Sequence, residues 1–152
     1  MAGVFLNVNS GEVALAAATA KTVLQIKAPA NQRLLIHSIR FLGKQPAGGT
    51  DTPIKIRMTR NSAAFGTGSA ATPAKNDPSD SETVQSTAAS NFSAEPTTPT
   101  DGGIWWELQP QIAIEEFLPP GQEIKIPGGQ SVQFECTSVG TPTLVITVGY
   151  QE

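Results

Sequence analysis

The chain alternates between short apolar segments and turn-forming residues, and this alternation limits the folds open to it. Ile54, Ile56 and Met58, for example, alternate with polar residues. A period of two places one kind of side chain on each face of a β-strand. Its 14 glycines and 12 prolines separate most such segments, and no stretch shows the spacing of an amphipathic helix. The pattern therefore predicts an all-β chain.

The predicted strands are short and numerous. Many short strands joined by Gly/Pro turns are typical of an antiparallel β-sandwich, and we expect a jelly-roll-like one. Trp105 and Trp106 must lie on opposite faces of one strand, and Trp106 shares its face with Ile104 and Leu108. We therefore expect Trp106 in the core and Trp105 outside it. The expected strands cover residues 4–8, 22–27, 33–42, 54–60, 104–109, 112–117, 123–126, 131–137 and 143–150.

The length of 152 residues predicts a single domain. We expect residues 11–152 to form this single β-sandwich domain. Residues 61–103 differ in composition, since small and polar residues dominate them and four prolines exclude a long helix. We expect this segment to be one long irregular loop excursion over the surface, anchored by Val84 and Phe92.

Few residues could support catalysis or hold a metal. The single histidine and single cysteine exclude a Cys/His zinc site and an intrachain disulfide. His37 lies among apolar neighbours and Cys136 falls on an inward face, so structural roles are favoured for both. Asp77, Asp80 and Glu82 could gather around calcium, although ordinary turn chemistry also explains them. We predict no enzyme activity, no catalytic residue and no cofactor or metal.

The charge is distributed unevenly along the sequence. Residues 1–60 hold eight basic and two acidic groups (+6), whereas residues 61–152 hold two basic and eleven acidic groups (−9), which gives the net charge of −3. Lys55, Arg57 and Arg60 form a basic cluster that could bind nucleic-acid phosphates. The acidic net charge and the scarcity of aromatic residues argue against that partner. Solvated faces and docking on an oppositely charged protein remain the alternatives.

The sequence contains neither a membrane-spanning segment nor a secretory signal that we can recognise. The chain has no apolar run near the ~18–20 residues of a membrane-spanning helix, so we expect no membrane partner. Its N-terminal sequence lacks a basic segment followed by an apolar one, and we therefore expect synthesis in the cytoplasm without a secretory signal.

Four stretches resemble a family of tailed-bacteriophage head decoration, or cement, proteins. They are the segment Ala20–Arg33, the block Ala71–Pro78, the segment Ser93–Thr97 and the turn Pro127–Gly129. The resemblance extends over roughly residues 12–150. It implies a β-sandwich that binds the outer surface of an assembled capsid as a homotrimer and bridges neighbouring major capsid subunits. It implies no catalytic residues, and it makes residues 1–10 a candidate arm that adds a strand to a partner's sheet.

The expected function is therefore that of a structural virion protein, located on the outer capsid surface. The alternative is a carbohydrate-binding or adhesin-like module on a phage head or tail, with Trp105 as an exposed platform. A hydrolase on the same scaffold would need a pocket with convergent polar groups. The candidate contact residues are Phe5, Leu6, Lys55, Arg57, Arg60, Phe92, Trp105 and Glu115.

Overall fold

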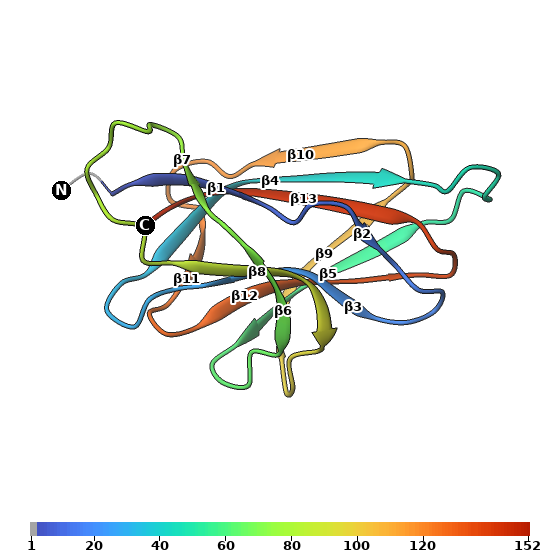
Figure 1. Ribbon diagram of the computed structural model, residues 1–152, viewed down its shortest axis with the longest axis horizontal. Coiled ribbons are helices and arrows are strands. Elements are labelled where there is room, and N and C mark those ends of the chain that lie inside the picture. Colours follow the sequence, from blue (N-terminus) through green and yellow to red (C-terminus); the bar gives the residue numbers. More distant parts are fainter. Residues whose placement is uncertain (1–2) are drawn as a thin grey trace.

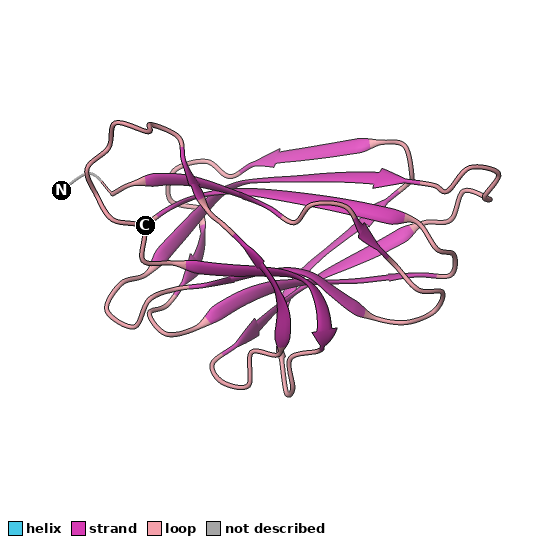
Figure 2. Cartoon of the chain, viewed as in Figure 1, coloured by secondary structure: helices cyan, strands magenta, loops and turns pink. Residues whose placement is uncertain are grey.

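The chain folds into two β-sheets that pack face to face. A computed structural model describes residues 3–152, and Figures 1 and 2 show strands and loops throughout this range. Neighbouring strands in both sheets pair antiparallel. The predicted antiparallel β-sandwich is confirmed, whereas its jelly-roll connection pattern stays a prediction.

The two sheets, here called sheet A and sheet B, have the following strand orders. In sheet A, neighbouring strands follow the order β10 (Ala113–Phe117), β4 (Leu34–Lys44), β13 (Thr143–Gln151), β1 (Phe5–Asn9) and β7 (Ala74–Lys75). Two short strands are added to it: β11 (Ile124–Ile126) pairs with β4, and β2 (Val13–Ala14) pairs with β13. Sheet B runs β6 (Thr67–Ala71), β8 (Thr87–Ala94), β3 (Lys21–Lys27), β12 (Ser131–Ser138), β5 (Ile54–Asn61), β9 (Thr100–Leu108).

Alternate side chains of the central strands fill the space between the sheets. Aromatic rings join the two layers, because Phe41 of sheet A lies 5.0 Å from Trp106 and 6.1 Å from Phe134 of sheet B, measured between ring centroids. Phe41 and Phe134 are fully buried. Such tilted and edge-on pairs add about 0.5–1.5 kcal/mol each to the stabilisation from burial.

The segment 61–103 is mostly regular structure, so the expectation of one irregular loop was wrong. It contributes β6, β7, β8 and the beginning of β9. The sequence pattern did not reveal these strands because they contain mostly small residues. Strand β8, for example, reads Thr-Ala-Ala-Ser-Asn-Phe-Ser-Ala, and its buried face consists largely of Ser90 and Phe92. A strand near the edge of a sandwich needs little side-chain volume to fill its side of the core. The irregular part of the segment is largely residues 76–86.

The N-terminal segment is part of the sandwich, so the expectation of a free arm was also wrong for the described residues. Strand β1 pairs with β13 from Phe5 to Asn9 and with β7 on its other side. Leu6 and Val8 are buried in the core. The first two residues of the expected arm lie outside the described part of the chain.

Loops cover part of the outer face of sheet B. The Gln25 amide donates to the carbonyl of Phe65 at 3.0 Å and to the Gln133 side chain at 2.8 Å. Asn61 donates to the carbonyls of Ala64 and Thr97 at 3.2 Å. The loops 61–66 and 95–99 therefore help to bury a polar layer in which the Gln25 and Asn61 amides are bonded, which limits the cost of burying them, whereas the buried Thr59 hydroxyl has no partner among the described residues.

A buried network fixes the irregular residues 76–86 to the end of β13. The Glu152 carboxylate accepts hydrogen bonds from the backbone N–H of Gln85 and Ser86 and from the Ser86 hydroxyl, at 2.7, 3.0 and 2.6 Å. The Ser86 hydroxyl lies 2.8 Å from the Tyr150 hydroxyl. Burial, with a smaller contribution from Glu152, raises the pKa of Tyr150 to about 12, although the Ser86 hydrogen bond opposes this rise.

The pKa of Tyr150 predicts a loss of stability in alkali. Because the folded state holds the phenol proton more tightly than the unfolded state (~10), this stabilisation is complete below pH 10 and is lost between pH 10 and 12. A shift of this size corresponds to roughly 3 kcal/mol. Tyr150 is the only tyrosine, so tyrosinate absorbance measures its titration directly. The unfolding free energy of Tyr150→Phe should lack this part of the pH dependence; a midpoint near 10 in folded protein would contradict the prediction.

Candidate interaction surfaces

One flank of the sandwich exposes large apolar side chains on two edge strands. Trp105 of β9 is 57% exposed, Phe117 of β10 is 71% exposed, and Ile112 in the turn between these strands is 53% exposed. These are three of the five large apolar side chains that are exposed among the described residues. Strands β9 and β10 also end their sheets, so one side of each backbone is unpaired. We call this surface the β9–β10 flank.

The two tryptophans point in opposite directions, as predicted. Trp106 packs against the core, and its indole N–H donates to the Glu116 carboxylate of β10 at 2.7 Å. Trp105 points outward, where the Arg57 guanidinium lies 5.5 Å from its ring centroid. Arg57 in turn donates to Glu135 at 2.7 Å, so a row of three side chains crosses β9, β5 and β12.

Folding mixes the charges that the sequence separates. The basic strands β4 and β5 each pair with a strand that carries acidic residues, and the register places Arg40 opposite Glu115 and Lys55 opposite Glu107. Arg57 and Glu135 form an ion pair. At these three positions, a basic group from the +6 part of the sequence therefore lies beside an acidic group from the −9 part.

The structure divides the predicted contact residues into three groups. Lys55, Arg57 and Trp105 lie together on the outer face of sheet B, whereas Phe5 and Glu115 lie on the outer face of sheet A. Arg60 donates to the Lys125 carbonyl at 2.7 Å and so ties the two sheets at one end. Leu6 (0% exposed) and Phe92 (4% exposed) are buried within the subunit, so their prediction as contact residues was wrong.

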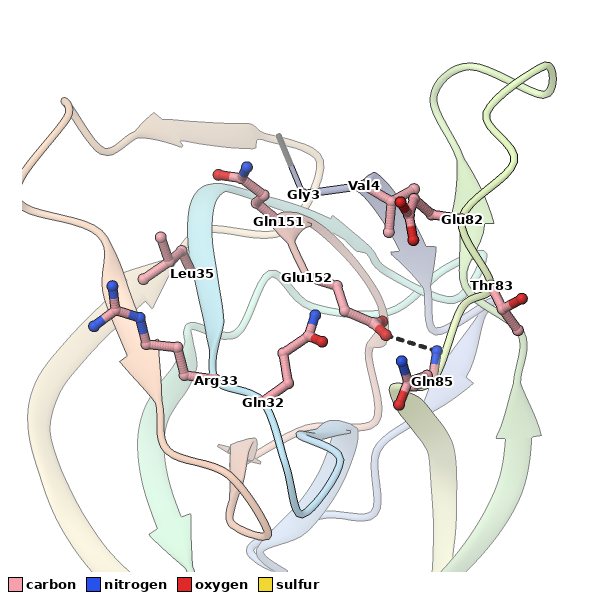
Figure 3. Close-up of a pocket in the computed structure, with 10 residues that line it drawn as sticks. All are labelled: Gly3, Val4, Gln32, Arg33, Leu35, Glu82, Thr83, Gln85, Gln151 and Glu152. Atoms are coloured by element: carbon pink, nitrogen blue, oxygen red, sulfur yellow. Dashed lines mark hydrogen bonds between the residues drawn. The ribbon is translucent and has the colours of Figure 1, made fainter. Parts of the chain in front are cut away.

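A hollow lies at the end of the sandwich where the network of Glu152 is found. It measures about 370 Å³, and Figure 3 shows polar side chains such as Gln32, Arg33 and Glu82 around it. Glu152 points to the backbone N–H of Gln85, as the dashed line shows, and this carboxylate already accepts three hydrogen bonds. The carboxylate therefore serves to hold residues 76–86 in place.

Two smaller hollows adjoin each other on the outer face of sheet A. One, of about 240 Å³, lies over Gly149 and is bordered by Arg40 and Glu115. The other, of about 250 Å³, is bordered by Phe5 and His37, whose rings meet edge-on at 5.6 Å between centroids. Burial lowers the pKa of His37, and nearby Glu123 opposes this change only partly. No polar atom among residues 3–152 pairs with the buried Nε2 of His37.

The residues considered for chemistry are mostly used in the fold. Cys136 is fully buried, and burial raises the pKa of its thiol well above the usual value. Asp77 accepts from the Ser79 backbone N–H and hydroxyl, which lowers its pKa, and Asp80 accepts from the Glu82 backbone N–H. These are bonds within turns, and residues 3–152 contain no group of three potential metal ligands. Within the same range, no helix is long and apolar enough to cross a membrane.

Comparison with known proteins identified no relative. No protein-family model matches the chain, and neither a curated protein nor a solved structure is significantly similar to it. The candidate surfaces therefore rest on the chain's own residues.

The two tryptophans provide a matched test of this geometry. Trp106→Phe keeps a ring in the core but removes the donor to Glu116, and hydrogen bonds to charged groups contribute about 1.5–3 kcal/mol. Because Glu116 is partly exposed, we expect a loss near the lower end of this range in urea unfolding. Trp105→Phe, on the exposed side, should change stability by less than about 0.5 kcal/mol. Equal effects of the two substitutions would show that the assignment is wrong.

Proposed function

We propose that this chain is a structural protein of a phage head, which binds the outer capsid surface and cements neighbouring major capsid subunits. In this role it forms a homotrimer on the virion. The resemblance of segments such as Ala20–Arg33 to head decoration proteins supports the class of protein. The observation that carries the proposal is the β9–β10 flank, with its exposed apolar side chains beside unpaired strand edges.

The flank has the properties of a protein contact surface. Unpaired strand edges can hydrogen-bond to another chain, and soluble proteins usually protect them with charges, bulges or covering segments. Trp105 is exposed on the outer face of sheet B and Phe117 on the outer face of sheet A, so a large apolar side chain stands beside each unpaired edge. On β9, Glu107 and a register shift opposite Met58 and Thr59 limit unspecific pairing, so the flank favours a defined partner over aggregation.

The opposite flank of the sandwich has a different surface, as a head-to-tail contact between subunits in a ring requires. There the chain passes directly from β6 in sheet B to β7 in sheet A, and β6 carries only small residues. A contact between two different surfaces of the same chain closes into a ring when the rotation allows it. Such a ring would leave an outer face of each sandwich free to bind the capsid.

Cementing requires only that the protein binds the assembled shell better than its separate subunits. A ligand at concentration c that binds only one state stabilises it by RT ln(1 + c/Kd) per site, so the effect grows with ligand concentration and with the number of sites. No catalytic group is needed for this mechanism.

The alternative, carbohydrate binding at Trp105, has less support. Trp105 is exposed, as that function requires, but its ring lies beside Arg57 and borders none of the three hollows described above. An aromatic ring without convergent polar groups offers area but little specificity for a sugar. The same exposure fits a protein contact.

The solution mass of the purified chain tests the proposed trimer. Light scattering after gel filtration should give three times 15.9 kDa. The double variant Trp105→Ser, Ile112→Ser should shift this mass to that of a monomer, because the β9–β10 flank loses its apolar contacts. Val139→Ser removes a side chain that is 73% exposed in another turn, and it should leave the trimer intact.

Binding to heads tests the cementing role. Heads of the encoding phage, prepared without this protein, should bind it in cosedimentation and should then resist heating better. The flank double variant should bind less, and Val139→Ser should bind normally. Absence of binding to such heads, with a folded protein, would refute the proposal.

A further inference from the structure

We propose that the outer face of sheet A is a binding site for a neutral oligosaccharide, independent of the β9–β10 flank. The site is the hollow over Gly149, here called the sheet-A hollow, together with the adjoining hollow at Phe5 and His37. This activity is separate from capsid cementing and does not depend on it.

Side chains pack closely over Gly149 of β13 at the base of the sheet-A hollow. A Cβ atom there would lie 2.3 Å from the Ser38 hydroxyl, 2.8 Å from Cε1 of His37 and 3.0 Å from the Asn7 amide oxygen. Gly149 is itself buried, so these side chains already cover its backbone and leave no room for a larger residue. The glycine thus lets Ser38, His37 and Asn7 converge at the base of the hollow.

Polar groups at the rim of the hollow are free to bind a ligand. The Arg40 guanidinium and the Glu115 carboxylate lie opposite each other on β4 and β10, and both residues are exposed. No side-chain hydrogen bond or ion pair within residues 3–152 engages these two groups or the Ser38 hydroxyl. Thr147, on the far side, accepts from Asn9 and keeps its own hydroxyl proton. A few convergent polar groups of this kind define specificity in ligand sites.

The chemistry of the rim selects a neutral ligand with hydroxyl groups. Arg40 offers only donors and ionised Glu115 only acceptors, whereas Ser38 and Thr147 offer both. A phosphate or carboxylate ligand would meet the charge of Glu115, and a cation would meet that of Arg40. A sugar hydroxyl both donates and accepts, and it leaves the two opposite charges balanced.

An aromatic ring in the adjoining hollow provides a surface for the apolar face of a sugar ring. Phe5 lines that hollow and lies two residues before Asn7 on β1. Two residues along a strand span ~7 Å, so the two hollows follow each other along the strands. Each hollow is smaller than the ~300–1,000 Å³ of typical ligand sites, and the ligand therefore extends across both.

The test uses an array of neutral oligosaccharides alongside their sialylated and uronic-acid counterparts, followed by titration calorimetry with any glycan retained. We expect a neutral glycan to bind and acidic counterparts to bind less. Arg40→Ala and Glu115→Gln should each weaken binding about tenfold. Trp105→Ala, on the other sheet, should leave the affinity within twofold, which separates this site from a platform at Trp105.

Several outcomes would overturn the inference. These are the absence of any neutral glycan that binds, a preference for acidic glycans, or unchanged affinity in both Arg40→Ala and Glu115→Gln. Loss of binding in Trp105→Ala would place the site on sheet B instead. Circular dichroism and solution mass of each variant show whether it folds and assembles, so the glycan result is independent of the trimer and of head binding.

Discussion

The aromatic contact between the two sheets is the interaction on which the rest of the structure depends. Phe41 meets both Phe134 and Trp106 from the opposite layer. Because Trp106 must enter this cluster, Trp105 must point outward, and the Glu116 carboxylate is drawn in to bond the indole. The burial of Trp106 thus connects β9 of sheet B to β10 of sheet A through Glu116, and it leaves Trp105 exposed on the same flank.

Burial of polar groups explains the arrangement on the outer face of sheet B. Gln25 and Gln133 bond each other beneath loops 61–66 and 95–99, and the Lys27 ammonium lies 4.0 Å from the Phe65 ring centroid. Those loops belong to the segment whose composition predicted one long irregular excursion. Their small residues allow close approach to the sheet, and their backbone carbonyls satisfy the buried amides. Composition alone does not reveal such a role, because it depends on which strand the loop crosses.

The candidate surfaces could be predicted only in part. Alternation in the sequence was sufficient to place Trp105 outside and Trp106 inside, since neighbouring strand residues always face opposite ways. It did not show that Leu6 and Phe92 are buried, because both lie in segments whose pairing partners are far away in the sequence. The sheet-A hollow was missed entirely. Nothing in the sequence around Gly149 indicates this hollow, because the hollow forms only where β1, β13 and β4 lie side by side.

By itself, the sequence determined the all-β class, most strand positions and the direction of side chains along each strand, because these follow from local alternation and turn residues. Tertiary structure alone decided which strands are neighbours. That choice brought Arg40 to Glu115 and Arg57 to Glu135, and so placed basic groups of the first part of the chain beside acidic groups of the second. It also set two edge strands beside each other on one flank. Such juxtapositions depend on long-range pairing, which local residue preferences do not encode.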